Sequence, residues 1–558
     1  MKKRVWGFTV AVFLFVMVLS GCSKSGGGDA AESGNSTGDN GTTGKPASIS
    51  VFAPQGSDAD LNTNWFSKQM EDKFNIKFTW QTTTYDASSA SEKRKISLAS
   101  GDYPDLYLLV PWVDHFSQAE LLKYGKQGVI IPLNDLINEY APHVVEAINT
   151  HPYYKAMLTA PDGNIYGIPQ LNECYHCTYE AKMWLNTDWL KKLNLEMPAT
   201  TEDFKKVLEA FKTKDPNGNG KADEVPISGS VNWNWTSPVP FLMNAFIYDD
   251  DQTYLLMDNG KVEFAPNKEG WRQGLEYLHS LYQEGLIDPG AFTQNADAYL
   301  ALGDNAEAPI LGAGPAMHPG IFLSDKSRLY ADVYNPVAPL KGPDGTSYAT
   351  YNYPSSPGGD FVLTNKASKE AQIAAIKVLD YMYTTEGATE GYLGKEGLDW
   401  RKPQEGEKAI EDGVQPLYAT IPAKDGEAPH NSAWGAMAQY YHNKAYRDGI
   451  VQDTDIYKDT GYERRLQEAT HLYDGKEPSE VFPHWATWVD PSEADEVSML
   501  RTNIQSYIQQ NTSQFIMGKK DLNKDWDSYV NGFEKLNLKR YLDIMQAEYD
   551  QYKKSSGN

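Results

Sequence analysis

An alternation of strand-like and helix-like patterns opens the body of the chain and constrains its fold more than any other feature. Strand patterns fall on 49–53, 76–80 and 106–110, and helical patterns fall between them on 61–74 and 91–99. Alternating apolar residues suit a strand, whereas a helix repeats its apolar positions every three or four residues. The order strand, helix, strand, helix, strand predicts a parallel α/β sheet with helical crossovers.

The length of the chain predicts more than one core. Its 558 residues exceed the roughly 250 to 300 residues at which a single hydrophobic core stops growing. Thr200 and Asp203 form a capping pair before one later helix, and Ser492 and Asp495 form another before a long C-terminal helix. Gly285 is placed to end a third helix. We expect an α/β protein of two or more domains whose later part is mainly helical.

The first residues are typical of a bacterial export signal with a lipid-attachment site. The basic residues of 2–4 precede an apolar run over 5–19, and Leu19-Ser20-Gly21-Cys22 follows directly. The alternative is a plain membrane helix, but the run is shorter than the roughly 20 residues that span a bilayer. We predict a signal peptide over 1–21 and a diacylglycerol on the thiol of Cys22. Two acyl chains, such as palmitate, suffice for stable anchoring.

The segment 22–46 is predicted to be a flexible tether behind the lipidated cysteine. It consists largely of Gly, Ser, Thr, Asn and Asp, which cannot bury enough apolar surface to offset the entropy of ordering. The formal net charge is -24, and removal of the basic leader makes the body more acidic. Such a body should bind neither nucleic acid nor anionic lipid. We therefore expect a monomer held at the extracellular face of the cell membrane by its lipid anchor.

Two cysteines, Cys174 and Cys177, remain once Cys22 carries a lipid. In an oxidising compartment the pair forms either a small disulfide loop or two buried thiols, and the sequence leaves this open. With His176 they offer too few ligands for a zinc site, and the sequence holds no second pair. No metal or redox role is expected here.

The sharpest local motif is a loop with the spacing of a calcium site. Oxygen-bearing side chains occupy its positions one, three, five and nine, and Gly220 occupies position six, as in an EF-hand-like turn. Position twelve is Pro226, so the loop is not a standard EF-hand, and a solvated turn without metal is the alternative. We expect a structural calcium ion with the following ligands, Lys221 contributing its backbone carbonyl: Asp215, Asn217, Asn219, Lys221, Asp223 and Glu224.

Short motifs of common enzymes are missing from the sequence. There is no GxGxxG after a strand, no GxxxxGK, no GxSxG and no HExxH. The aromatic residues are mainly amphipathic, with 14 Trp and 35 Tyr against 19 Phe. Such side chains suit a surface that binds a sugar, although ordinary packing explains them equally well. The missing motifs are weak evidence against catalysis, because glycosidases and lyases are recognised by the geometry of their sites and not by short motifs.

Several segments together resemble the extracellular solute-binding lipoproteins of carbohydrate ABC transporters, in the long Gram-positive branch similar to alginate-oligosaccharide-binding proteins. Their order and spacing carry the resemblance along the whole chain. Besides the calcium-type loop, the matching segments are 98–105, 132–137, 162–169, 183–190, 281–288, 394–400 and 525–529.

The resemblance implies a two-lobed fold of the periplasmic-binding-protein type, with crossing hinge segments and the ligand in the cleft between the lobes. We expect 47–170 mainly in the first lobe, 171–300 mainly in the second, 301–365 mainly in the first lobe and hinge, and 366–558 mainly in the second with the C-terminal helices. The implied function is to capture an oligosaccharide and deliver it to the permease subunits of an ABC importer. A lipid-anchored polysaccharide-degrading enzyme and a ligand-presenting receptor for a membrane sensor are the alternatives.

Aromatic and acidic residues are the candidates for ligand binding. The resemblance assigns Asp399 and Trp400 to a segment that reaches the cleft, and Trp400 is the leading candidate for stacking on a sugar ring. The polar run around Trp233 and Trp235 packs badly as core, so exposed structural tryptophans are the alternative there. The remaining candidates are Trp112, Tyr353 and Trp434. The sequence does not name the sugar, its linkage or its length.

Overall fold

The computed structural model describes residues 45–305, 309–324, 327, 332–353, 355, 357–424, 426–490 and 492–556. The predicted signal peptide, the lipidation site Cys22 and the tether up to residue 44 lie outside the described residues. Within the described part, no helix combines the length and the apolar character that crossing a membrane requires.

A four-stranded sheet forms the first lobe. Across the sheet its strands are β11 (Phe361–Leu363), β3 (Leu106–Leu108), β1 (Ala47–Pro54) and β2 (Ile76–Thr83). The strand β1 is parallel to both β2 and β3, with Val51 opposite Trp80 on one side and Leu106 on the other. The expected parallel sheet is confirmed for these strands, and β11 adds an antiparallel edge.

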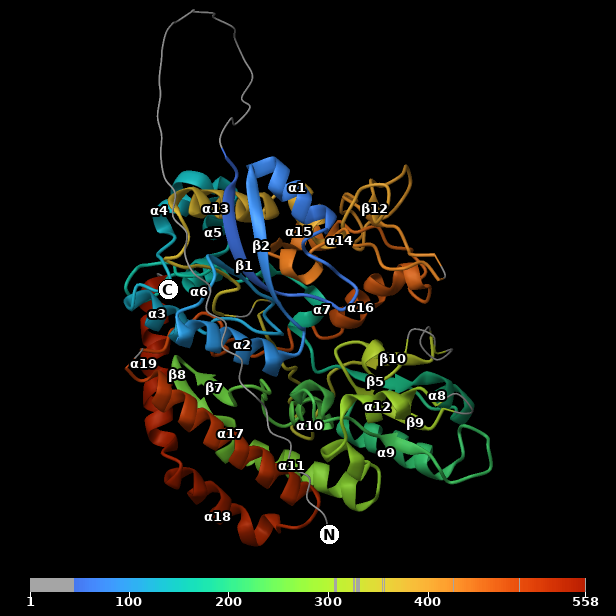
Figure 1. Cartoon of the computed structure of the whole chain (residues 1–558). Coiled ribbons are helices and arrows are strands. Elements are labelled where there is room, and N and C mark those ends of the chain that lie inside the picture. Colours follow the sequence, from blue (N-terminus) through green and yellow to red (C-terminus); the bar gives the residue numbers. More distant parts are fainter. Residues whose placement is uncertain are drawn as a thin grey trace, which may run out of the picture. The chain divides into compact units, whose positions relative to one another are not determined.

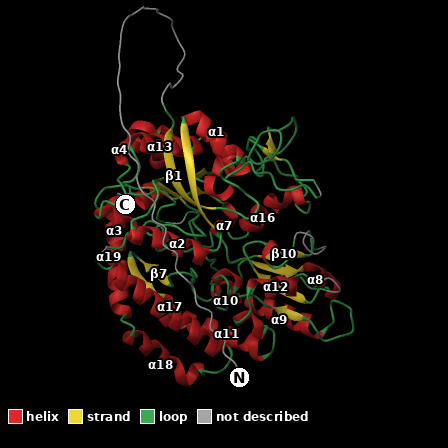
Figure 2. Ribbon diagram, in the orientation of Figure 1, coloured by secondary structure: helices red, strands yellow, loops and turns green. Residues whose placement is uncertain are grey.

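Helices cover the first sheet. The crossovers are α1 (Trp65–Phe74) and α2 (Ala87–Ser100), each opened by a side chain, Asn64 or Asp86, that accepts a backbone N–H. The later helix α13 (Lys369–Met382) contacts β1, α1 and α4 (Asn134–Tyr140). Figures 1 and 2 show α1, α4 and α13 around β1.

A second four-stranded sheet forms the second lobe. Its order is β10 (Tyr334–Val337), β5 (Met183–Asn186), β9 (Leu311–Pro315) and β6 (Val225–Ile227). The strand β5 is antiparallel to both of its neighbours, and β6 is parallel to β9. Figure 1 shows three helices next to this sheet: α8 (Thr187–Leu193), α9 (Thr201–Thr213) and α12 (Ala296–Gly303).

The strand pairings correct the expected lobe boundaries. Residues 301–365 were expected mainly in the first lobe, but β9 and β10 pair within the second sheet and only β11 joins the first. Within residues 366–558, which were expected mainly in the second lobe, α13 packs on β1 of the first lobe, whereas α17 (Ala494–Ile516) packs on α11 (Glu269–Gln283). The local pattern of a strand does not determine its partner, because pairing depends on contacts far apart in sequence.

Three predicted helix ends test the local interpretation. The Thr200 hydroxyl accepts the N–H of Asp203 at 3.1 Å and opens α9, as expected. The helix α11 (Glu269–Gln283) ends just before Gly285, which has a φ of 66°. The predicted cap by Ser492 is wrong, because its hydroxyl donates to the Asp490 carboxylate at 2.6 Å and α17 (Ala494–Ile516) starts without a side-chain cap.

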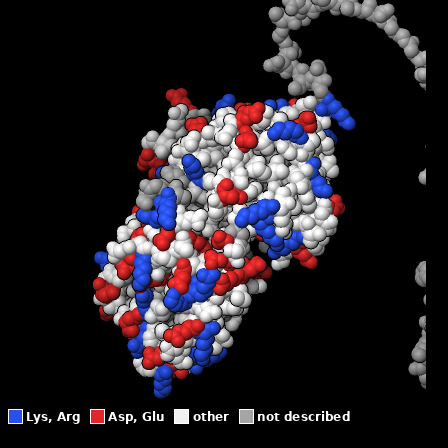
Figure 3. Space-filling view, turned by 90° about the vertical axis from the view of Figure 1, so that its left-hand side faces the viewer, with Lys and Arg blue, Asp and Glu red and all other residues white. Residues whose placement is uncertain are grey.

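The remaining elements are short or peripheral. The further helices are α3 (Gln118–Lys126), α5 (Pro142–Thr150), α6 (Pro152–Leu158), α7 (Tyr175–Thr178), α10 (Pro238–Met243), α14 (Thr385–Leu393), α15 (Lys444–Asp448), α16 (Tyr462–His471), α18 (Leu522–Lys535) and α19 (Leu538–Ser556). Two-stranded pairs are β4 (Leu171–Asn172) with β14 (Tyr441–His442), β7 (Leu255–Asp258) with β8 (Lys261–Phe264), and β12 (Trp400–Arg401) with β13 (Ala419–Thr420). Acidic and basic side chains are interspersed on the face shown in Figure 3.

Candidate ligand-binding cleft and cation loop

A cavity of about 710 Å³ lies between the two sheets. Another cavity, of about 1030 Å³, is a shallow depression on the surface of α2. To the cavity between the sheets, the first lobe contributes the turn after β3 and the start of α3, including Trp112 and His115. The second lobe contributes Glu180 before β5 and Met317 after β9, and α17 closes one side. We call this space the cleft. Its walls come from both lobes, so a molecule bound there contacts both.

The aromatic side of the cleft contains two of the predicted residues. Trp112 is 61% exposed, so its indole faces are largely free of packing. Tyr353 stacks on the buried Trp485, with ring centroids 5.7 Å apart and an interplanar angle of 23°. An exposed indole at the edge of a cavity suits stacking on the C–H face of a sugar ring. The structure thus brings Trp112 and Tyr353 together in one cavity.

A hydrogen-bonded group of polar side chains lies beside these aromatic residues and also lines the cleft. The amide of Asn352 donates to the Glu180 carboxylate at 2.6 Å, and its oxygen lies 3.2 Å from Nε2 of His484. Burial lowers the pKa of His484 to about 4, so the ring is neutral near pH 7 and donates through Nε2. The group presents orientable donors and acceptors of the kind that hydroxyl groups match.

Burial also shifts the charge state of a neighbouring pair. It raises the pKa of Glu180 to about 7, against the hydrogen bonds from Asn352 and Gln252 that lower it. It lowers the pKa of Lys182 to about 7, although Nζ donates to the carbonyl of His176 at 2.7 Å and to that of Tyr179. Burial therefore favours the neutral form of Glu180, whose carboxyl group can donate as well as accept a hydrogen bond.

Two charged residues of the C-terminal helices complete the cleft. Arg501 on α17 and Glu548 on α19 both line the cavity. Each has one buried atom, Nε of Arg501 and Oε1 of Glu548, without a hydrogen-bond partner among the described residues. Burial raises the pKa of Glu548 to about 7, and the positive charge of Arg501 opposes that shift. Unpartnered buried polar atoms are costly, which favours a ligand that pairs them.

Sequence reasoning did not identify Arg501, Glu548, His484 or Asn352. The helix over 494–516 was predicted from its apolar stripe, but the cleft is lined both by Val497 of that stripe and by the polar Ser498 and Arg501. The only local signal was a basic residue, Arg501, four positions after Val497 and therefore on the same side of the helix as the stripe. That Arg501 and Glu548 line the same cavity depends on the packing of α17 against α19, which the sequence does not show.

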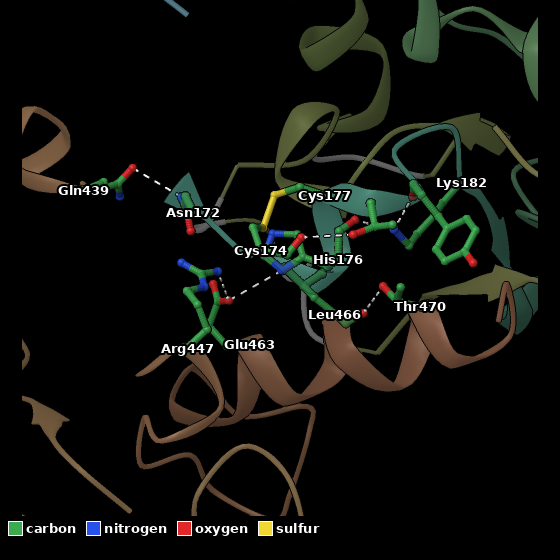
Figure 4. Close-up of a disulfide and its surroundings, with 12 residues drawn as sticks. Asn172, Cys174, His176, Cys177, Lys182, Gln439, Arg447, Glu463, Leu466 and Thr470 are labelled. Carbon is green, nitrogen blue, oxygen red and sulfur yellow. Dashed lines mark hydrogen bonds and ion pairs between the residues drawn. A yellow bond between two sulfur atoms is a disulfide. The ribbon is translucent and has the colours of Figure 1, made fainter. Parts of the chain in front are cut away.

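The two cysteines form a disulfide at the edge of the cleft. Figure 4 shows Cys174 and Cys177 bridged across the short helix α7, with an S–S distance of 1.97 Å. Both line the cleft, and Nδ1 of His176 lies 3.7 Å from the Glu463 carboxylate. The three residues are the one group of potential metal ligands within 4.8 Å among the described residues. A disulfide offers no thiolate to a metal, so the bridge serves to fix this loop.

Two further predicted residues lie away from the cleft. Trp400 is 7% exposed, packs with Tyr418 and Tyr446, and donates its indole N–H to the Gly394 carbonyl at 2.9 Å. The carboxylate of Asp399 accepts the backbone N–H of Lys395 at 2.7 Å. The prediction that Trp400 and Asp399 bind the ligand is corrected, because their polar groups are satisfied inside this loop cluster and neither lines the cleft.

Trp434 is likewise a core residue. It is buried, donates its indole N–H to the Ser67 hydroxyl at 2.9 Å, and meets Phe66 edge-on with centroids 4.9 Å apart. Both faces are occupied by packing, so its assignment to ligand binding is corrected. Trp233 and Trp235 stack on each other with centroids 5.1 Å apart, and neither lines the cleft.

The calcium-type loop connects α9 to β6 and is shaped by its own side chains. The Asp215 carboxylate accepts the N–H groups of Asn219 at 3.1 Å and Gly220 at 3.0 Å. The side-chain oxygen of Asn219 accepts the N–H of Lys221 at 2.7 Å. Gly220 has a φ of 74°, a conformation that glycine adopts without strain. The strand β6 follows where an EF-hand has its exit helix, as expected.

The donor set of the loop fits a hard cation. The amides of Asn217 and Asn219 donate to the Asp223 carboxylate, and these bonds lower the pKa of Asp223. Oε1 of Glu224 is buried without a partner, and its pKa is raised by burial and by the charges of Asp215 and Asp223. An orphaned carboxylate oxygen beside other carboxylates is the environment that a cation relieves.

The comparisons with known proteins agree with this architecture. The family model described as "Bacterial extracellular solute-binding protein" matches residues 65–398. The fructooligosaccharide ABC transporter substrate-binding protein FusA of Streptococcus pneumoniae is 29% identical over 506 residues, 88% of either chain. Lipoprotein LipO of Bacillus subtilis is 25% identical over 429 residues, 74% of this chain and 76% of LipO.

Solved structures give the same result. The S. pneumoniae FusA EF-hand mutant in complex with fructo-nystose has a TM-score of 0.69 and 26% identity, covering 91% of this chain and 99% of that one. An extracellular solute-binding protein of Bifidobacterium longum subsp. infantis has a TM-score of 0.74 at 22% identity, covering 92% and 99%. The fold is therefore the two-lobed solute-binding type.

The chain belongs to the bacterial extracellular solute-binding proteins. These are binding proteins and not enzymes, which agrees with the expectation from the sequence.

Proposed function

We propose that this protein captures an oligosaccharide in its cleft and delivers it to the permease subunits of an ABC importer. The observation that carries the proposal is the combination, in one cavity between two lobes, of an exposed indole with unpartnered buried polar atoms on Arg501 and Glu548. FusA, which is named for fructooligosaccharides, supports the class of ligand. Closure of two lobes over a ligand is the usual mechanism of such capture.

Each wall of the cleft has its own task in the proposal. Trp112 stacks on an apolar face of one sugar ring, while Asn352 and His484 hydrogen-bond to hydroxyl groups. Arg501 and Glu548 pair with neighbouring hydroxyl groups that match their planar ends. The cleft disfavours negative charge, because burial raises the pKa of Glu180 and of Glu548. A neutral oligosaccharide fits these walls.

We further propose that Cys22 is lipidated and holds the protein at the extracellular face of the cell membrane. The lipobox Leu19-Ser20-Gly21-Cys22 supports this anchoring, as does the similarity to the lipoprotein LipO. A Cys22→Ala variant should remain soluble after cell fractionation while it keeps its ligand affinity. Sedimentation of that variant with membranes would contradict the lipid anchor.

A structural calcium ion in the loop 215–224 is the third part of the proposal. The buried, unpartnered oxygen of Glu224 supports it, and so does the description of a FusA structure as an EF-hand mutant. Asp215, Asn217, Asn219, Asp223 and Glu224 would hold the ion with side-chain oxygens, and Lys221 would add its carbonyl. The ion would neutralise the carboxylates and tie α9 to β6; it has no role in chemistry.

Calorimetry of the purified protein with neutral oligosaccharides that include kestose tests the proposed function. We expect saturable binding at one site and recovery of the sugar unchanged, because nothing is transformed. New reducing ends in the recovered sugar would indicate an enzyme. The absence of binding across fructo-, gluco- and xylo-oligosaccharides would reject the ligand class.

A further inference from the structure

A second cavity, of about 360 Å³, lies within the second lobe and shares no lining residue with the cleft. Its walls come from 230–240, from the segment Asp249–Tyr254, from α11, from the 3-10 turn Pro289–Phe292 and from α17. The segment Asp249–Tyr254 separates the two spaces, because Gln252 lines the cleft whereas Asp251 lines the second cavity. We call this space the lobe-2 cavity.

The separating segment is held in a defined conformation. The Asp250 carboxylate accepts the N–H groups of Gln252 at 3.1 Å, Thr253 at 2.8 Å and Tyr254 at 2.7 Å. Asp251 and Tyr254 both have positive φ values, 57° and 58°, which side-chain-bearing residues rarely adopt. This turn fixes Asp251 and Tyr254 at the wall of the lobe-2 cavity, and so the wall is preformed.

Three side chains that line the lobe-2 cavity have polar atoms for which the described part of the chain supplies no hydrogen-bond partner. They are Oδ2 of Asp251, Nε1 of Trp271 and Oγ1 of Thr512. The residues are 2%, 1% and 7% exposed, so bulk solvent does not satisfy these atoms. Buried polar groups in proteins are nearly always paired, and each unpaired one costs about 1 to 3 kcal/mol. Three around one space indicate that its occupant supplies the missing partners.

The chemistry of these atoms selects the class of occupant. The indole N–H of Trp271 needs an acceptor, which an ammonium group does not offer. A carboxylate ligand would satisfy that N–H, but none of the described lining residues is basic, so its buried charge would have no counter-charge. Burial raises the pKa of Asp249 and of Asp251, which shows that this space disfavours negative charge. A hydroxyl group both donates and accepts, so several hydroxyls on one molecule match all three atoms. Trp233, 45% exposed, lines the same cavity and offers an aromatic face.

From this arrangement we propose that the lobe-2 cavity is a second binding site, separate from the cleft, for a compact neutral polyhydroxylated molecule of monosaccharide size. Its volume lies at the lower end of the range of small-molecule pockets, roughly 300 to 1,000 Å³. The site does not depend on the proposed function of the cleft, because no residue is shared between them.

Fluorine NMR of the protein labelled with 5-fluorotryptophan tests the site directly. The Trp271 resonance, assigned with Trp271→Phe, should shift saturably on titration with at least one of fructose, glucose and myo-inositol. Thr512→Val removes one hydroxyl without changing the side-chain shape, and it should weaken that response at least fivefold. The matched control is Thr502→Val, on the cleft face of the same helix, which should leave the response unchanged.

A parallel titration of Arg501→Gln distinguishes the two sites. The Trp271 shift should persist in this variant, whereas oligosaccharide binding in the cleft weakens. A Trp271 resonance unmoved by all three sugars at 100 mM would overturn the proposal, as would a shift that disappears in Arg501→Gln but survives in Thr512→Val. A shift with acetate or tetramethylammonium alone would refute the neutral class. If Trp271→Phe does not fold, crystals of the wild type soaked separately in fructose, glucose and myo-inositol replace the assignment. Density for one of these sugars in the lobe-2 cavity would support the site, and the absence of density for all three would overturn the proposal.

Discussion

Replacing Trp112 with alanine should weaken ligand binding and leave the stability of the fold nearly unchanged. The Trp112 side chain is 61% exposed, so its loss removes little packing. The free energy of unfolding should therefore change by no more than about 0.5 kcal/mol. If the indole covers a sugar ring in the closed cleft, its removal should cost on the order of 2 kcal/mol of binding free energy. That is about a thirtyfold loss of affinity.

The matched control is Trp400→Ala, which changes the same residue type at a buried position. Trp400 is 7% exposed and packs with Tyr418 and Tyr446, so its truncation should destabilise the fold by about 3 to 5 kcal/mol. The protein that remains folded should bind with unchanged affinity, because Trp400 does not line the cleft. The two variants should thus show opposite effects on stability and affinity.

Calorimetry with kestose, or with whichever oligosaccharide binds the wild type, gives the affinities, and thermal melting gives the stabilities. An affinity within threefold of wild type for Trp112→Ala would refute the assigned stacking position. A large affinity loss in well-folded Trp400→Ala would instead support the assignment made from the family resemblance.

Further variants probe the polar wall and the cation loop. Arg501→Gln should weaken oligosaccharide binding about tenfold to a hundredfold, since a hydrogen bond from a charged group contributes about 1.5 to 3 kcal/mol; unchanged affinity in calorimetry would remove Arg501 from the site. The pKa of Glu548 is about 7 in the folded protein, against 4.5 for the free side chain. Between these two pH values the folded state holds a proton that the unfolded state releases, so the free energy of unfolding falls as the pH rises from 4.5 to about 7. At pH 8, Glu548→Gln should therefore have a free energy of unfolding up to roughly 3 kcal/mol higher than that of the wild type, and at pH 5 the two should be equal. The exposed control Glu534→Gln should match the wild type at both pH values. Calcium at a hundred times its dissociation constant should stabilise the protein by about 2.7 kcal/mol, and Asp215→Ala with Asp223→Ala should abolish that gain; equal melting temperatures of wild type in calcium and in chelator would exclude the ion.

Local signals in the sequence were sufficient for the elements that depend on neighbouring residues. The alternation over 49–53 and 76–80 predicted β1 and β2, and Thr200 with Asp203 predicted the start of α9. The turn of the calcium-type loop was readable because its shape depends on side chains a few residues apart, such as Asp215 and Gly220.

The cleft was less predictable because it depends on contacts between distant segments. Arg501 and Glu548 meet only through the packing of α17 against α19, and Asn352 reaches Glu180 across 172 positions of sequence. Trp400 carried the family motif but packs in its own loop cluster, where the Gly394 carbonyl accepts its indole N–H. Residue type alone did not distinguish a tryptophan that offers a face from one that fills a core.

The most direct test of the central claim is a crystal structure of the protein with an oligosaccharide that binds it in calorimetry. We predict that the sugar lies between the two sheets, with one ring on Trp112 and hydroxyl groups paired with Arg501 and Glu548, and that the two lobes approach each other more closely than in the free protein. A sugar bound elsewhere, or bound against Trp400 with Arg501 and Glu548 still unpaired, would contradict the account.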